Sequence, residues 1–114
     1  MEQIAPAESV RLANLGAVAA VRTSVNCELL GLSILNTQAA AIFVQLFDAA
    51  TAGAVTLGTT VPLLEFNVAA SVPANPPFPP GGVRFRTGCQ IASTTTEGGA
   101  AASAAGVFVY ALVT

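Results

Sequence analysis

The chain has 114 residues, which is enough for one domain with one core. Charged residues make up 9% of the chain, far below the roughly 25% of an ordinary soluble domain, and the formal net charge is −2. Without histidine or lysine, most general-base and Schiff-base chemistry is excluded, and two cysteines alone are half of a metal-ligand set. Four arginines against six scattered acids cannot supply the phosphate contacts of a nucleic-acid-binding protein. We therefore expect a protein that is not an enzyme and has no cofactor, metal or nucleic-acid partner.

Hydrophobic residues reach 54% of the chain, too many for a monomer that lacks the usual lysine and glutamate cover. Two explanations exist: burial against protein partners, or a membrane. The uncharged stretch 29–47 approaches the length of a membrane span, but polar residues interrupt it and Asn36-Thr37-Gln38 indicates a turn. The acidic start, with Pro6, shows no export signal. We therefore favour protein partners and no membrane, and keep a small membrane-associated protein as an alternative.

The first half of the chain has the patterns of β-strands. The stretch 9–16 alternates Val10 and Leu12 with polar or small residues, and 17–36 is rich in β-branched residues, which predicts one or two strands with a bulge at Gly31. The strongest strand is 41–47, which is apolar on both faces. Both of its faces are therefore expected to be buried.

The second half continues in short alternating strands. Residues 64–68 and 83–86 each alternate apolar and polar side chains, and the threonines that follow Ile91 favour an exposed strand over 89–96. The final strand, 107–113, has apolar residues on both faces, with Phe108, Tyr110 and Leu112 on one of them.

These segments amount to about seven or eight short strands separated by Gly, Pro, Asn and Thr. They predict an all-β protein, a single-domain antiparallel β-sandwich or a jelly-roll-like barrel over residues 16–114. Residues 1–15 are predicted to be an N-terminal arm or an edge segment. Cys27 and Cys89 are expected to be small buried hydrophobic residues, with a disulfide as the alternative.

Five of the seven prolines lie between Pro73 and Pro80, followed by two glycines. Prolines restrict the unfolded chain, so such a loop loses little entropy when it becomes ordered. Its centre is either a rigid cap on the core or a projecting contact with another subunit. Arginines two residues apart on a strand suit carboxylates of a neighbouring chain, or lie on the solvated face of an edge strand. The sequence therefore gives five candidate interface residues: Pro77, Phe78, Pro79, Arg84 and Arg86.

Four stretches together resemble a family of small virion proteins of tailed phages. They are AAAIFVQLFDAAT, TVPLLEFNV, GVRFRTGCQIASTTTEGG and VFVYALVT, and the resemblance covers roughly residues 25–114. It is a likeness of strand order and turn residues and includes no catalytic motif. Members of such families are capsid decoration (cement) proteins or other structural proteins of the phage head.

The resemblance implies a virion protein made in the host cytoplasm that stabilises the capsid surface by binding the major capsid protein. Sites on three-fold axes of a shell favour a homo-oligomer, in particular a trimer. A surface poor in Lys and Glu fits this interpretation, because interface centres are depleted in charge. A phage tail or fibre module, or a carbohydrate-binding β-sandwich, is an alternative that the same fold would allow.

Overall fold

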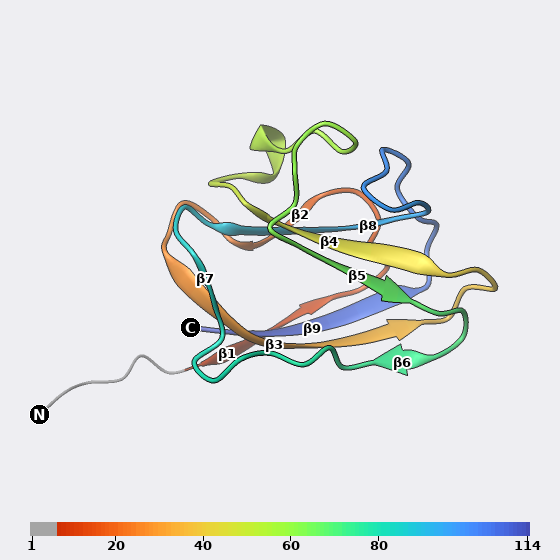
Figure 1. The fold of residues 1–114 in the computed structure, drawn as a ribbon, viewed down its shortest axis with the longest axis horizontal. Coiled ribbons are helices and arrows are strands. Elements are labelled where there is room, and N and C mark those ends of the chain that lie inside the picture. Colours follow the sequence, from red (N-terminus) through yellow and green to blue (C-terminus); the bar gives the residue numbers. More distant parts are fainter. Residues whose placement is uncertain (1–6) are drawn as a thin grey trace, which may run out of the picture.

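The computed structural model describes residues 7–114, which form two antiparallel sheets packed face to face (Figure 1). Sheet A contains β1 (Glu8–Leu12), β9 (Val107–Val113), β3 (Cys27–Asn36), β6 (Pro73–Ala74) and β7 (Val83–Phe85). Sheet B contains β2 (Ala19–Arg22), β8 (Cys89–Thr94), β4 (Ile42–Asp48) and β5 (Leu64–Val68). One 3₁₀ helix, η1 (Ala52–Ala54), follows β4. The predicted all-β sandwich is therefore confirmed.

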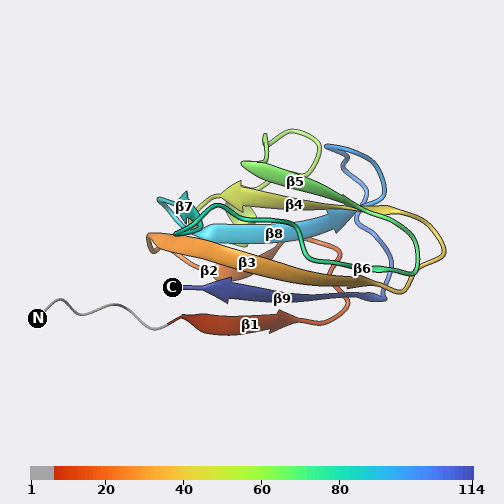
Figure 2. The ribbon, with the colours of Figure 1, turned by 60° about the horizontal axis from the view of Figure 1, so that its bottom comes forward.

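The strands pair from the outside of the sequence inwards. β1 pairs with β9, β2 with β8, β3 with both β6 and β7, and β4 with β5. The chain is thus a long two-stranded ribbon that turns between β4 and β5 and wraps over itself, so that β9 also pairs with β3 and β8 with β4. This rolled ribbon is the topology of a jelly roll. Figure 2 shows the two resulting layers.

The main core lies between the two sheets. The inward-facing residues of β9, Val107, Val109, Ala111 and Val113, are all completely buried, as the alternation of this strand predicts. They pack with the inward-facing residues of β4 and β8, among them Val44, Leu46 and Ile91. A side chain of this kind contributes roughly 1.5–3 kcal/mol when it is buried completely, so this layer supplies most of the stability of the sandwich.

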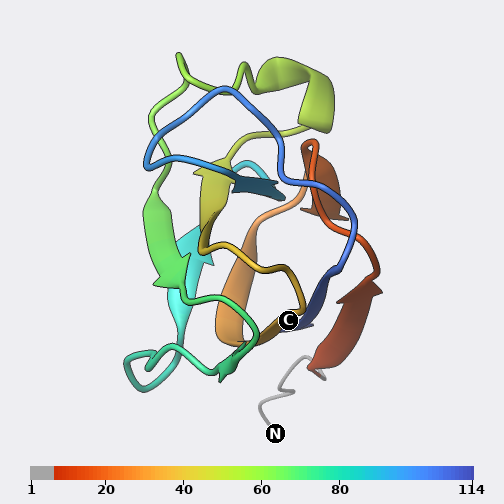
Figure 3. The same cartoon turned by 90° about the vertical axis from the view of Figure 1, so that its right-hand side faces the viewer.

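A smaller core covers the opposite face of sheet B. Phe47 from β4 and Ala92 from β8 are buried there against Val55, with Leu57 partly buried beside them. Figure 3 shows the segment around η1 and the β8–β9 loop on this side of sheet B. The prediction that β4 is buried on both faces is confirmed, because loops supply the second cover.

The expectation of an exposed strand after the proline-rich loop is wrong. All six residues of β8 are buried, since β8 is an inner strand of sheet B and is covered on both faces. The strand ends at Thr94, and only the following Thr95 and Thr96 are exposed. The Thr94 hydroxyl accepts a hydrogen bond of 2.9 Å from the Gln45 amide and donates one of 2.9 Å to the backbone oxygen of Thr96. Threonine is therefore accommodated here by internal hydrogen bonding instead of by water.

A long strand and a turn occupy the uncharged stretch that approaches membrane-span length. β3 has a register shift between Leu29 and Gly31, which is the predicted bulge, and ends at Asn36. The buried Asn36 amide donates to the carbonyl oxygens of Ala40 and Ala69, at 3.0 and 3.1 Å, and so fixes the turn into β4. Among residues 7–114, no helix is long and apolar enough to cross a membrane.

Both cysteines are free thiols in the main core, as the composition suggests. Burial raises the pKa of Cys89 to about 12, with smaller contributions from Cys27 and Asp48. Burial also raises the pKa of Cys27. Since the thiolate is the reactive form of cysteine, both residues act here as small apolar side chains.

Candidate interaction surface

The outer face of sheet A is exposed and mostly apolar. Phe108, Tyr110 and Leu112 project from β9 on the side away from the core, and Leu35 projects from β3 beside Phe108. Tyr110 is 47% exposed, and Leu112 and Leu35 are each 43% exposed. In the described chain the loops around η1 and after β8 cover the outer face of sheet B, whereas sheet A has no such cover. A contiguous apolar face of this kind is typical of an interaction site.

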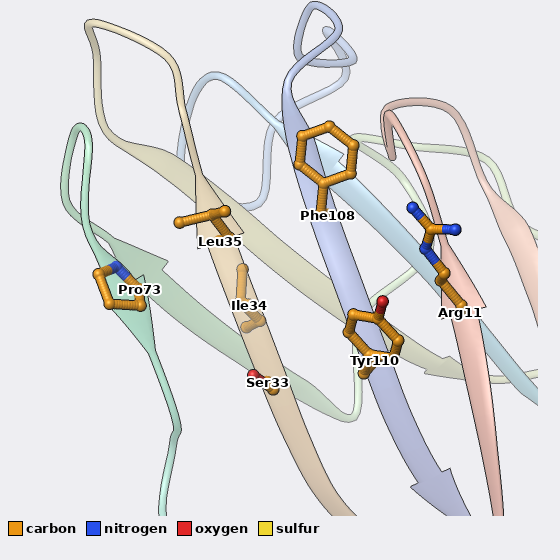
Figure 4. Close-up of a pocket in the computed structure, with 7 residues that line it drawn as sticks. All are labelled: Arg11, Ser33, Ile34, Leu35, Pro73, Phe108 and Tyr110. Atoms are coloured by element: carbon orange, nitrogen blue, oxygen red, sulfur yellow. The ribbon is translucent and has the colours of Figure 1, made fainter.

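A groove of about 470 Å³ crosses this face. It runs from β1 over β9 and β3 to β6 and is lined by seven residues: Arg11, Ser33, Ile34, Leu35, Pro73, Phe108 and Tyr110. Figure 4 shows how these side chains lie on the four strands. We call this site the sheet A groove. Its walls are apolar or aromatic, with two hydroxyl groups and one charge, a composition that suits an extended peptide or a small polar ligand.

Among the residues that the structure describes, Arg11 is the only charged one that lines the sheet A groove. The pairing of β1 with β9 places it opposite Tyr110, and its guanidinium carbon lies 6.0 Å from the centre of the Tyr110 ring, within cation–π range. Among residues 7–114, no carboxylate lies within ion-pair distance of Arg11. The groove therefore offers a guanidinium to an incoming carboxylate.

The proline-rich loop between β6 and β7 holds three of the predicted interface residues. Phe78 is half-buried and packs against the main core, with its ring centre 6.0 Å from that of Phe66 in β5. Pro77 and Pro79 on either side of it are exposed. Of the two arrangements that the sequence allows, the structure thus has the one in which the loop caps the core. Its contact with another subunit stays a prediction.

The two predicted arginines follow this loop in the chain. Arg84 in β7 lies opposite Glu28 of β3, and their side chains form an ion pair of 3.1 Å. Arg86 follows the strand, and its backbone N–H donates to the Asp48 carboxylate at 3.2 Å. Arg84 therefore already has a carboxylate within its own chain, and the guanidinium of Arg86 has no ion pair with the described residues.

The sheet A groove was not among the predicted sites. One signal for it was present, because the last strand is apolar on both faces and only one face of a sheet packs against the other sheet, so the second face needs a different cover. The contact between Arg11 and Tyr110 could not be predicted from the sequence. Arg11 and Tyr110 meet only because the first strand pairs with the last one.

The described residues contain no group of three or more His, Cys, Asp or Glu side chains that could hold a metal ion. In comparisons with known proteins, no family model matches the chain, and neither a curated protein nor a solved structure gives a significant match.

Proposed function

We propose that this protein is a non-enzymatic structural component of a virion, a capsid decoration protein that binds the major capsid protein and stabilises the shell. The observation that carries the proposal is the exposed apolar outer face of sheet A on a chain with almost no charge. Such a surface is suited to permanent protein–protein contact, because little charge has to be desolvated when it is covered.

The size of the surface strengthens this argument. The accessible surface of the chain is 5976 Å², close to the roughly 5,800 Å² that the scaling of area with mass gives for 11.4 kDa. Folding thus leaves an ordinary amount of surface, on a chain with only four basic and six acidic residues. Association with other chains is the way in which a protein of this composition can cover its apolar area.

The fold is compatible with this role at the level of analogy. Jelly rolls occur in viral capsid proteins, and they occur in lectins as well. Because a fold can host many functions, the proposal depends on the surface and on the resemblance to phage head proteins.

A carbohydrate-binding module is the second candidate. The exposed Tyr110 ring, with the Arg11 guanidinium and the Ser33 hydroxyl beside it, has the elements of a sugar platform. Replacing Tyr110 by Ser would abolish glycan binding in an array or in calorimetry if this function is correct. The resemblance and the scarcity of other aromatic residues in the groove favour the structural role.

Purified virions test the proposal directly. We expect the protein in particles of the source virus at a fixed molar ratio to the major capsid protein, measured by quantitative mass spectrometry. Shells that lack it should lose their contents at lower temperature and regain resistance when purified protein is added. Shells of equal resistance with and without the protein, or its absence from virions, would overturn the proposal.

A further inference from the structure

We propose that the sheet A groove is the receptor for the N-terminal segment, residues 1–6, of a second copy of this chain. This contact would join copies head to tail. This inference rests on the proposed function in one respect: the contact would form the oligomer that a decoration protein needs.

The acids of the chain are largely committed elsewhere. Glu8 pairs with Arg22 at 2.9 Å and Glu28 with Arg84 at 3.1 Å. Asp48 accepts hydrogen bonds from two backbone N–H groups, and Glu65 accepts one of 2.7 Å from Gly98. Of the remaining two acids, Glu97 forms no ion pair with the described residues, and Glu2 lies outside them.

Glu97 is exposed in the loop after β8, which lies over sheet B, the opposite side of the sandwich from Arg11. Glu2 is carried by a short segment, MEQIAP, that is apolar at Ile4. An acid two residues from an isoleucine matches a groove with one guanidinium at one end and Phe108, Leu35 and Pro73 at the other. Glu2 is therefore the carboxylate best suited to Arg11.

The direction of β1 favours a second copy over the same chain. Residues 1–6 precede Glu8, which lies opposite Val113, whereas the apolar end of the groove lies beyond Arg11 at Phe108 and Leu35. The segment of the same chain would have to turn back along β1 to reach that end of the groove. A segment that arrives from a neighbour needs no such reversal.

Face-to-face packing of two sheet A surfaces is a poorer solution, because it would bring two Arg11 side chains into one interface without an acid. A segment that enters a groove on the next copy is a heterologous contact. Such contacts close into rings when the rotation allows, and a ring of three is the trimer that the resemblance to phage head proteins implies.

The test measures association of the isolated protein by sedimentation equilibrium, without shells. The full chain should form a closed oligomer at micromolar concentration, and a chain lacking residues 1–6 should be a folded monomer. Glu2→Gln and Arg11→Gln should each weaken association about tenfold. Glu97→Gln removes the same charge elsewhere and should leave association unchanged. Combining Glu2→Arg with Arg11→Glu should restore what either change alone removes.

A cross-link identifies the occupant. In a double variant, Ile4→Cys with Leu35→Cys, mild oxidation should give disulfides between chains on a non-reducing gel. A disulfide within one chain, no disulfide, a monomeric full chain, or a truncated chain that associates as before would each overturn the inference. So would an effect of Glu97→Gln equal to that of Glu2→Gln.

Different results would contradict the proposed function and the proposed groove contact. A protein whose association requires residues 1–6, yet which is absent from virions, would support the groove contact and overturn the decoration role. A virion component whose truncated form still associates would do the reverse.

Discussion

At the scale of single residues, Asp48 connects the end of β4 to the turn before β8. Its carboxylate accepts hydrogen bonds from the backbone N–H groups of Arg86 and Thr87, at 3.2 and 2.9 Å. Partial burial opposes ionisation, but these N–H donors outweigh it and lower the pKa of Asp48 below its ordinary value. The charged form is therefore bound more tightly in the folded state than in the unfolded state.

This gives a pH dependence with a defined sign. A carboxyl with a depressed pKa contributes stability above its unfolded pKa of about 4, and this contribution is lost as the pH falls through the lower folded value. Asp48→Asn should cost about 1 kcal/mol at neutral pH, below the roughly 1.5–3 kcal/mol of charged hydrogen bonds because Asp48 is exposed to solvent. In urea titrations the two proteins should become equally stable in acid. A constant difference down to the lowest pH would contradict this account.

The two glycines after the prolines have different reasons to be glycine. Gly81 has a φ of +83°, and the Gly82 N–H donates a hydrogen bond of 2.9 Å to the carbonyl oxygen of Pro79. Together with Pro80 at the second position, these are the features of a type II turn. A Cβ on Gly81 would meet no atom within 4 Å. A Cβ on Gly82 would collide with the Leu29 carbonyl oxygen and lie 2.9 Å from a methyl carbon of Leu30.

Gly82→Ala should therefore destabilise the protein by about 3 kcal/mol, because it combines an unfavourable φ with a backbone collision. Gly81→Ala is the matched control and should cost only about 1 kcal/mol, the conformational part alone. Chemical denaturation of both variants checks the difference. Equal losses would mean that β3 shifts freely away from the loop.

At the scale of elements, the proline-rich loop is anchored by one aromatic contact. Phe78 packs on Phe66 and on the rim of the main core. Phe78→Ser should lower the free energy of unfolding by about 2 kcal/mol, less than the loss for a fully buried ring. Phe78→Leu, which keeps an apolar side chain, should lose about 1 kcal/mol or less. If Phe78→Ser unfolds at the same denaturant concentration as the parent protein, the loop is not a cap.

The sequence predicts the strands better than it predicts which segments pack on their outer faces. Alternation is a local property, so β4, β7 and β9 can be recognised and their inward residues named. β8 was misjudged because its outer cover comes from loops far from it in sequence, among them the one that places Val55 on Ala92. The sheet A groove also depends on segments that are far apart in sequence, because the pairing of the first and last strands decides which residues line it. It could therefore not be predicted.

At the scale of the whole molecule, the rolled ribbon makes folding depend on distant contacts. Glu8 pairs with Val113, and every strand of sheet B except β5 has a partner far along the chain. Closing such loops costs entropy before any contact forms, so we expect refolding in milliseconds to seconds, as for other β-sandwiches. Stopped-flow circular dichroism measures this rate. Complete refolding within microseconds would contradict this expectation.

Because β1 begins where β9 ends, with Glu8 beside Val113, the described chain enters and leaves the sandwich at one corner of sheet A. A passenger protein fused behind Thr114 would emerge from this corner and leave residues 1–6 unmodified. A passenger ahead of Met1 would instead add bulk to the segment that we propose enters the groove of the neighbouring copy. Display of a cargo on a shell would therefore call for attachment at the carboxyl end.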